Sequence, residues 1–258
     1  MTLPKIISTH SFRGGTGKSN TTANVAVLLA REGYRVGVID TDIQSPGIHL
    51  VFQADEASFG RCLNDYLWGR CAIEEAAYDV SVKCLGPAGS GGDRPKLYLI
   101  PSSLRSGEIA RVLREGYDVG RLNDGLQALV QRLALDYLFI DTHPGVNEET
   151  LLSLAVSDVL VLIVRPDKQD LQGTAVTVEL ARRLGVPELF LVVNKVAPGT
   201  DLAALREQIG RLFGADVEAL MPLSTEMVRL GSHDLFCNRY PDHPLTQELG
   251  KIVARLRR

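Results

Sequence analysis

The chain has 258 residues, of which 45% are hydrophobic and 23% are charged, and its formal net charge at pH 7 is −3. These values are ordinary for a folded globular protein, and they exclude a long disordered region. The slightly acidic balance argues against strong overall attraction to nucleic acid. We expect a single domain over residues 1–258, because an open α/β sheet of this size needs no second core.

Short apolar runs rich in β-branched residues predict strands that are buried on both faces, as in a parallel sheet covered by helices. In chain order they are residues 5–9, 36–39, 97–100, 137–140, 159–164 and 189–193. A helix is expected over residues 19–31, and apolar stripes of helical period occur over 122–133 and 245–256. Residues 86–95 are rich in glycine and proline, which predicts an exposed loop. The expected fold is therefore α/β, with a mostly parallel central sheet and helices on both faces.

The N-terminus shows no basic stretch followed by an apolar signal core, and no window approaches the ~20 apolar residues of a membrane span. We therefore expect a cytoplasmic protein. The four cysteines, Cys62, Cys71, Cys84 and Cys237, are scattered and form no C-x-x-C pair. Cytosolic cysteines of this kind are expected to be reduced structural thiols.

A glycine-rich segment lies between the first predicted strand and the first predicted helix. It reads Arg13-Gly14-Gly15-Thr16-Gly17-Lys18-Ser19. The general phosphate-loop pattern G-x-x-x-x-G-K-[ST] is matched except at its first glycine, which is Phe12. In such a loop the backbone amides and the helix N-terminus bind phosphate oxygens, Lys18 reaches the β and γ phosphates, and Ser19 ligates Mg²⁺. The segment predicts a nucleotide phosphate site.

A dinucleotide-binding fingerprint is the rival interpretation, because Gly15-Thr16-Gly17 is followed by Asp40 at the end of the next predicted strand. That fingerprint requires a third glycine where this chain has Asn20, and it has no role for a lysine inside the loop. The phosphate-loop interpretation is therefore favoured over hydride transfer.

Aspartates follow two further predicted strands. Asp40 and Asp42 come at the end of residues 36–39, and Asp141 follows residues 137–140 and begins the segment Asp141-Thr142-His143-Pro144-Gly145. Carboxyl ends of parallel strands meet at one edge of a sheet, so these carboxylates should lie beside the phosphate loop. A strand that ends in an aspartate and a glycine hinge is typical of an Mg²⁺-associated acid and a γ-phosphate-sensing loop.

The chain resembles the ParA/MinD family of deviant Walker ATPases over almost its whole length. The resemblance rests on residues 13–19 in place of K-G-G-x-G-K-[ST], on Asp40-Thr41-Asp42 as the D-x-D element, and on residues 141–145 as the D-[TS]-x-x-G element. In addition, Val192-Val193-Asn194-Lys195 looks like the family's adenine-recognition segment, and Met221-Pro222-Leu223 looks like its second base-contacting turn.

The resemblance implies an ATP- and Mg²⁺-dependent homodimer whose slow hydrolysis times the association. Asp40 would position the attacking water, and Ser19, Asp42 and Asp141 would surround Mg²⁺. Arg13 stands where the family has a signature lysine that reaches the partner's nucleotide, so its action across the dimer, alongside Lys18, is a hypothesis. The implied nucleotide contacts are Gly14, Gly15, Thr16, Gly17, Lys18, Ser19, Asn20, Asn194, Pro222 and Leu223. His143 replaces a small residue or proline of the family; it either tunes the switch loop or is an ordinary loop histidine.

Three kinds of task remain open from the sequence. The first is spatial organisation of a chromosome, a plasmid, the division machinery or other cargo, with an activating protein partner. The second is delivery of a metal or cluster on the same scaffold, through cysteines at a dimer seam. The third is a nucleotide switch that docks on one protein partner, with residues 64–69 around the only tryptophan as the candidate contact.

The C-terminal segment contains a cluster of basic residues that is relevant to DNA and membrane binding. Its basic residues are Lys251, Arg255, Arg257 and Arg258. They either form a nonspecific DNA-binding patch, doubled in a dimer, or complement the negative end of the last helix dipole, which is the favoured reading. We expect no direct membrane anchor, because the chain ends two residues beyond Leu256 of the inward-packing stripe.

Overall fold

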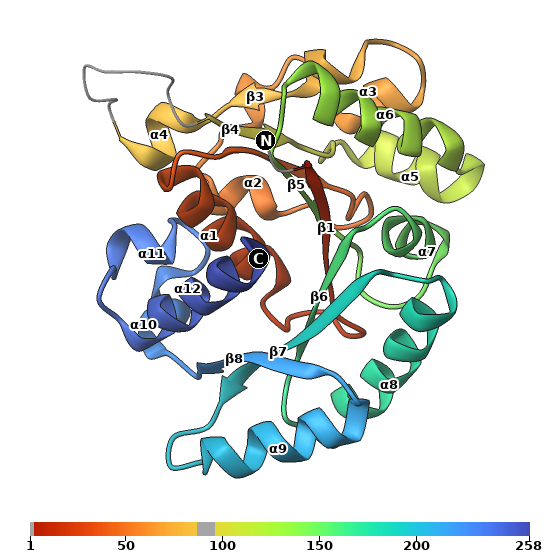
Figure 1. Cartoon of the computed structure of the whole chain (residues 1–258). Coiled ribbons are helices and arrows are strands. Elements are labelled where there is room, and N and C mark those ends of the chain that lie inside the picture. The colour runs from red at the N-terminus through yellow and green to blue at the C-terminus, as the bar shows by residue number, and fades with distance from the viewer. Residues whose placement is uncertain (1–2, 87–95) are drawn as a thin grey trace.

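The computed structural model describes residues 3–86 and 96–258. Within these residues, eight strands form one sheet in the order β3-β4-β2-β5-β1-β6-β7-β8 (Figure 1). The β3–β4 pair is antiparallel and every other neighbouring pair is parallel. The strands are β1 Lys5–His10, β2 Arg35–Asp40, β3 Tyr78–Asp79, β4 Lys96–Ile100, β5 Tyr137–Asp141, β6 Val159–Val164, β7 Glu188–Val196 and β8 Asp216–Pro222.

Helices cover both faces of the sheet. On one face α1, α2, α4, α11 and α12 pack around a common apolar core, and on the other face α3, α5 and α6 cover one half of the sheet while α7, α8 and α9 cover the other (Figure 1). The α-helices are α1 Lys18–Arg31, α2 Ile48–Val51, α3 Leu63–Leu67, α4 Ser81–Leu85, α5 Ser106–Glu115, α6 Val119–Arg132, α7 Glu148–Ala155, α8 Lys168–Arg183, α9 Leu202–Phe213, α10 Thr225–Leu230, α11 Phe236–Arg239 and α12 Pro244–Leu256. The 3-10 helices are η1 Glu56–Ser58 and η2 Ile73–Ala76.

The predicted α/β class, the six predicted strands and the three predicted helices are confirmed. The apolar runs are buried on both sides because helices flank them, and all of β5 and β6 is buried. Strands β3 and β8 were not expected, since β3 has only two residues and β8 alternates acidic and apolar side chains at an edge of the sheet. The loop expected over residues 86–95 lies, apart from Gly86, outside the described residues.

The strand register brings the sequence motifs together. Asp40 at the end of β2 is paired with Asp141 at the end of β5, and Thr9 near the end of β1 is the other neighbour of Asp141. The chain leaves β1 and turns into α1 at this same edge of the sheet. Both acidic elements therefore flank the glycine-rich segment, as expected for the crevice at the carboxyl ends of parallel strands.

Candidate functional site

Residues 11–17 form the turn from β1 into α1. Gly15 and Gly17 adopt φ of 72° and 100°, a left-handed conformation that favours glycine. Gly17 is also closely approached, because a Cβ there would lie 2.4 Å from Asn194 Nδ2. Helix α1 begins at Lys18, so its unpaired amides and the positive end of its dipole lie at the turn.

Side-chain hydrogen bonds hold the turn in shape. The Ser11 hydroxyl donates to the carbonyl of Arg13 (2.7 Å) and accepts from the Thr16 hydroxyl (2.8 Å). From strand β7, Asn194 Nδ2 donates to the carbonyl of Thr16 (2.7 Å) and Lys195 Nζ donates to the carbonyl of Gly15 (2.7 Å). Hydrogen bonds within the chain therefore organise the turn, which suits an anion cradle.

Lys18 is a buried cation among titratable groups. Its residue is only 7% exposed, and its charge lowers the pKa of both Asp141 and His10. A lysine is almost never fully buried unless opposite charges compensate it. Its position at the start of α1, between the glycine turn and the acidic strand ends, makes it available to phosphate oxygens.

Asp40 and Asp141 are a buried acidic pair. Burial, together with the repulsion from Asp141 and Asp42, raises the pKa of Asp40 well above its usual value. Burial likewise raises the pKa of Asp141 to about 6, against the opposing effects of Lys18 and of hydrogen bonds from Ser19 and Thr22. Two neighbouring carboxylates with raised pKa values indicate a site that a cation would stabilise.

The segment after β2 is folded onto its own aspartates. Asp40 Oδ1 accepts from the amide of Asp42 (3.0 Å), and Asp40 Oδ2 accepts from the amide of Gly47 (3.1 Å). Asp42 is half-buried, and its Oδ1 accepts from both the amide (3.1 Å) and the hydroxyl (3.0 Å) of Ser45. His143 Nε2 lies 3.9 Å from Asp42 Oδ1, so His143 connects the segments that follow β2 and β5.

His10 is a site residue that the sequence did not single out. It is fully buried at the end of β1, and burial, with the nearby charge of Lys18, lowers its pKa to about 3. The ring is therefore neutral. Thr142 Oγ1 lies 2.6 Å from His10 Nδ1 and 3.0 Å from the carbonyl oxygen of Thr9. This chain of hydrogen bonds joins the end of β1 to the segment after β5.

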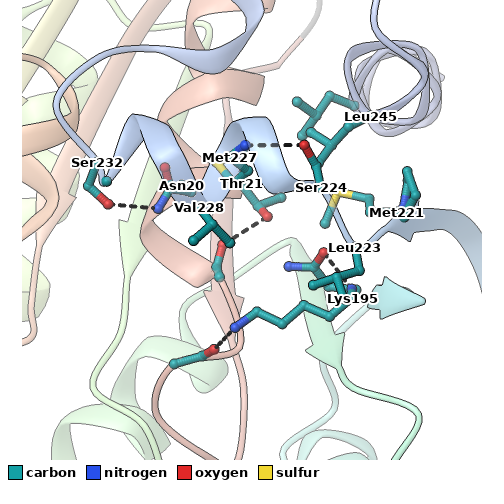
Figure 2. Close-up of a pocket in the computed structure, with 16 residues that line it drawn as sticks. Asn20, Thr21, Lys195, Met221, Leu223, Ser224, Met227, Val228, Ser232 and Leu245 are labelled. Atoms are coloured by element: carbon teal, nitrogen blue, oxygen red, sulfur yellow. Dashed lines mark hydrogen bonds between the residues drawn. The ribbon is translucent and has the colours of Figure 1, made fainter. Parts of the chain in front are cut away.

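A cavity of about 300 Å³ adjoins the glycine turn. Its walls come from the turn, from α1, from the end of β7, and from residues 221–232, which include α10 (Figure 2). Just over half of the lining side chains are apolar, and the polar ones are Asn20, Thr21, Asn194, Lys195, Ser224 and Ser232. A nucleotide base, which is flat, has largely apolar faces and carries polar groups at its edges, fits such a cavity.

The predicted base contacts Asn194, Pro222 and Leu223 all line this cavity, and so does Asn20. Asn20 Nδ2 donates to the Ser232 hydroxyl (3.1 Å), so its side chain is directed toward the wall of the cavity formed by residues 221–232. The sequence predicts Lys195 only as the last residue of the segment 192–195. The lining residues that the sequence did not single out for the site are Thr21, Ser224, Met227, Val228, Gly231, Ser232, Leu245 and Leu249. Met227 and Val228 lie in α10, which is too short to show helical periodicity.

Arg13 is exposed and donates from Nη1 to Oε1 of Gln169 in α8.

The basic C-terminal residues are largely paired with carboxylates of the same chain. Arg255 pairs with Glu188 (2.6 Å), Asp216 and Glu218, Arg257 pairs with Glu32 (3.2 Å), and Lys251 pairs with Glu248 (2.5 Å). Because these carboxylates pair with three of the four basic side chains, the alternative of a DNA-binding patch is weakened.

The cysteines gather no metal site in residues 3–86 and 96–258, where no group of three or more histidine, cysteine or acidic residues could hold an ion. Burial raises the pKa of Cys62 to about 11, of Cys84 to about 12 and of Cys237 to about 11. These thiols are protonated at neutral pH and suit the structural role expected for them.

In residues 3–86 and 96–258, no helix combines the length and the apolar composition needed to cross a bilayer.

A glycine turn between a central parallel strand and a helix, a buried lysine, two strand-end aspartates and an apolar side cavity define a P-loop nucleotide-binding protein. Comparison with known proteins identifies the family. The family model described as "ParA: NUBPL iron-transfer P-loop NTPase" matches residues 2–254. The chain belongs to this ParA family of P-loop NTPases.

Three known proteins illustrate the family. An uncharacterised ATP-binding protein of Methanocaldococcus jannaschii is 27% identical over 97% of this chain and 86% of its own length. The iron-sulfur cluster carrier protein of Pseudomonas fragi is 27% identical over 87% of this chain and 75% of its own. The septum site-determining protein MinD of Pyrococcus horikoshii, solved with Mg-ADP, shares the fold with a TM-score of 0.80 and 20% identity, over 98% of this chain and 96% of the other.

Proposed function

We propose that this protein binds ATP with Mg²⁺, dimerises in the ATP-bound state and hydrolyses ATP slowly, so that the nucleotide acts as a switch for spatial organisation of a cargo. The observation that carries the proposal is the buried Lys18 at the start of α1, between the glycine turn and the paired Asp40 and Asp141. The bound Mg-ADP of the MinD structure with this fold supports the choice of ligand.

The phosphates would bind at the turn. The amides of residues 14–19 and the N-terminus of α1 would donate to phosphate oxygens, and Lys18 would neutralise the β and γ phosphates. The base would enter the cavity between Asn194, Asn20, Pro222 and Leu223. Asn194 would have to share its amide with the base, since its Nδ2 already donates to the carbonyl of Thr16.

The donor set near the phosphates fits Mg²⁺, which prefers hydroxyl and carboxylate oxygens. Ser19 is close enough to Asp141 to lower the pKa of its carboxyl, and Asp42 is close enough to raise it. Mg²⁺ supplies charge neutralisation for the transferred phosphoryl group. Ser19 would ligate the ion directly, and Asp42 and Asp141 would hold its surrounding shell.

Asp40 would orient the attacking water. Each of its two carboxylate oxygens accepts one backbone hydrogen bond, which leaves lone pairs free, because a carboxylate can accept about four such bonds. The backbone bonds also hold the carboxylate rigidly at the strand end. A positioned acid of this kind contributes to hydrolysis through orientation of the nucleophile.

Arg13 would act across the dimer on the partner's nucleotide. Its guanidinium is exposed beside the phosphate turn, where Gln169 of the same chain holds it. An arginine at this position can bind phosphate oxygens with two parallel hydrogen bonds, which a lysine cannot do. Dimerisation would require the exchange of Gln169 for phosphate.

The cargo role draws on the family and on the site-determining function named for the MinD relative. An ATP-dependent dimer presents a surface that the monomer lacks, so an activating protein partner could read the nucleotide state. The proposal places the protein in the cytosol, where ATP and Mg²⁺ are available. DNA binding is left out of it, because carboxylates of the same chain already pair with Arg255, Arg257 and Lys251.

Delivery of an iron-sulfur cluster is the second candidate. It is favoured by the iron-transfer description of the family model and by the cluster carrier of Pseudomonas fragi. Cys62 and Cys71 are half-buried, so only they could contribute thiolates at a dimer seam without unfolding. Iron and sulfide analysis of the purified dimer separates the two candidates, and a stoichiometric cluster lost in Cys62→Ser would establish delivery.

Calorimetry with ATP in the presence and absence of Mg²⁺ tests the first candidate. We expect saturable binding by the wild type, stronger with Mg²⁺, and its loss in Lys18→Ala. Lys251→Ala, on the exposed side of α12, is the matched control and should bind as the wild type does. No uptake of ATP or ADP by the wild type, or unchanged binding by Lys18→Ala, would refute the proposal.

A further inference from the structure

Phe12 stands where the general phosphate-loop pattern has its first glycine. In α8, a glycine, Gly173, lies opposite this phenylalanine. The Phe12 ring lies directly against Gly173, where a Cβ would come within 1.9 Å of Phe12 Cδ1 and 2.3 Å of Cγ. Real Cβ atoms do not approach a ring so closely, so no other residue at 173 would leave this ring in place. The large side chain in the turn and the missing side chain in the helix fit each other.

Gly173 is otherwise unfavourable where it lies. It is buried in the middle of a helix of 16 residues, where glycine costs about 0.5–1 kcal/mol relative to alanine. Its φ is not in the left-handed region, so the backbone conformation does not require glycine there. The need for space beside Phe12 is the physical reason for this residue.

The first half of α8 has few apolar anchors of its own. Its buried residues before Val178 are Asp170, Gly173, Thr174 and Thr177, and the side chains of Asp170, Thr174 and Thr177 each keep a polar atom without a hydrogen-bond partner. Polar groups buried in this way contribute little to packing and carry a desolvation cost. In this part of the helix Leu171 also packs against the core, and the ring of Phe12 adds a second apolar contact.

The next residue of the turn is attached to the same face of α8. Arg13 donates to Gln169, which lies four residues before Gly173 and so points from the same side of the helix. Two successive residues of the phosphate turn, one apolar and one charged, are thus held by α8. The turn is bound to β7 on its other side through Gly15 and Thr16.

We propose that Phe12 and Gly173 form a positioning pair, in which the ring seated on α8 sets the leading segment of the phosphate turn and the location of Arg13. The inference rests on the proposed nucleotide binding and adds a residue to it. Phe12 itself touches no phosphate. It acts through the backbone of Arg13 and Gly14, so its loss should alter nucleotide affinity and ATP-dependent dimerisation together.

A double-mutant cycle tests the pair, with Phe12→Gly, Gly173→Ala and the combined variant. The readouts are the dissociation rate of a fluorescent ADP analogue, dimer formation with ATP by light scattering, and the thermal midpoint. Phe12→Gly removes the contact that orders the turn before nucleotide binds. Binding must then order one or two additional groups, so we expect the analogue to dissociate about tenfold faster. Gly173→Ala should do the same, because its methyl group displaces the ring.

In the Phe12→Gly background the added methyl group meets no ring, so Gly173→Ala should then change nothing or raise the thermal midpoint. Gly250→Ala in α12 is the matched control: a Cβ there meets nothing within 4 Å, and it should leave all three readouts unchanged or slightly improved. Phe12→Leu, which keeps an apolar contact, should recover part of the slow dissociation.

Three results would overturn the inference. One is an equal effect of Gly173→Ala in both backgrounds, which would show that the residues are not coupled. Another is a lowered thermal midpoint with unchanged nucleotide dissociation and dimerisation, which would reduce the pair to core packing. The third is failure of the wild type and of Gly250→Ala to bind nucleotide, which would remove the proposed function as well; the first two leave that function standing.

Discussion

Replacement of Asp141 by asparagine should make the nucleotide-free protein more stable while it weakens the proposed magnesium site. The carboxyl is 2% exposed, and its pKa is raised from 3.8 to about 6. Each tenfold change in proton affinity is worth about 1.4 kcal/mol, so the charged form lowers the free energy of unfolding by about 3 kcal/mol at neutral pH. Asparagine keeps the shape and an acceptor oxygen but has no charge to desolvate.

The pH dependence follows from the direction of this pKa change. Because the folded pKa lies above the unfolded one, the folded protein binds the proton more tightly, and the penalty is absent below 3.8 and complete above about 6. The nucleotide-free wild type should therefore lose stability as the pH rises through this interval. Asp141→Asn should lose less, although the raised pKa of Asp40 acts in the same direction in both proteins.

Urea unfolding of both proteins without nucleotide, at the two ends of that interval, measures the difference. We expect Asp141→Asn to exceed the wild type by about 2–3 kcal/mol at neutral pH, a gain of about 4–12 °C in thermal midpoint, and by little at the acidic end. Asp124→Asn, an exposed carboxylate on α6, is the control and should change stability by less than about 0.5 kcal/mol. Equal stabilities of Asp141→Asn and the wild type at neutral pH, or parallel pH profiles, would refute the reasoning.

Three further outcomes are expected. Arg13→Glu should keep ATP binding but lose the ATP-dependent dimer, which light scattering measures; an unchanged dimer would count against action in trans. Asp40→Ala should bind ATP and accumulate as a dimer, whereas normal phosphate release by this variant would remove Asp40 from hydrolysis. Gly17→Ala places a methyl group 2.4 Å from Asn194 Nδ2 and forces a φ of 100° on a side-chain residue; we expect ATP binding to fall at least about a hundredfold, and calorimetry showing wild-type affinity would contradict the close approach.

The central part of the fold could be predicted from the sequence because it depends on strong local signals. Buried parallel strands are apolar without interruption, and the glycine turn has a spacing that few other structures need. The strand ends then place Asp40 and Asp141 side by side, as expected. For the edge strand β8 the local signal is weak, since Asp216 and Glu218 interrupt its apolar residues and are compensated by Arg255 from α12.

The rest of the site depends on tertiary contacts that leave no periodic signal. His10 is the last residue of β1 and follows Ser8 and Thr9, and only the burial of its ring beside Thr142 shows its connection to the segment after β5. Met227 and Val228 belong to a six-residue helix that closes the cavity. The pairing of Phe12 with Gly173 joins residues far apart in sequence, and only the folded chain brings them together.

Lys195 connects the end of β7, which lines the cavity, to the glycine turn. It adopts φ of 59°, unusual for a residue with a side chain, while its backbone amide donates to Asn194 Oδ1 (2.8 Å) and its ammonium donates to the carbonyl of Gly15 (Figure 2). In the proposed nucleotide site, a displacement of β7 beside the base would therefore be transmitted to the turn that binds the phosphates. Adenosine and inorganic pyrophosphate, supplied as separate molecules, should consequently bind cooperatively, each raising the affinity for the other by the same factor.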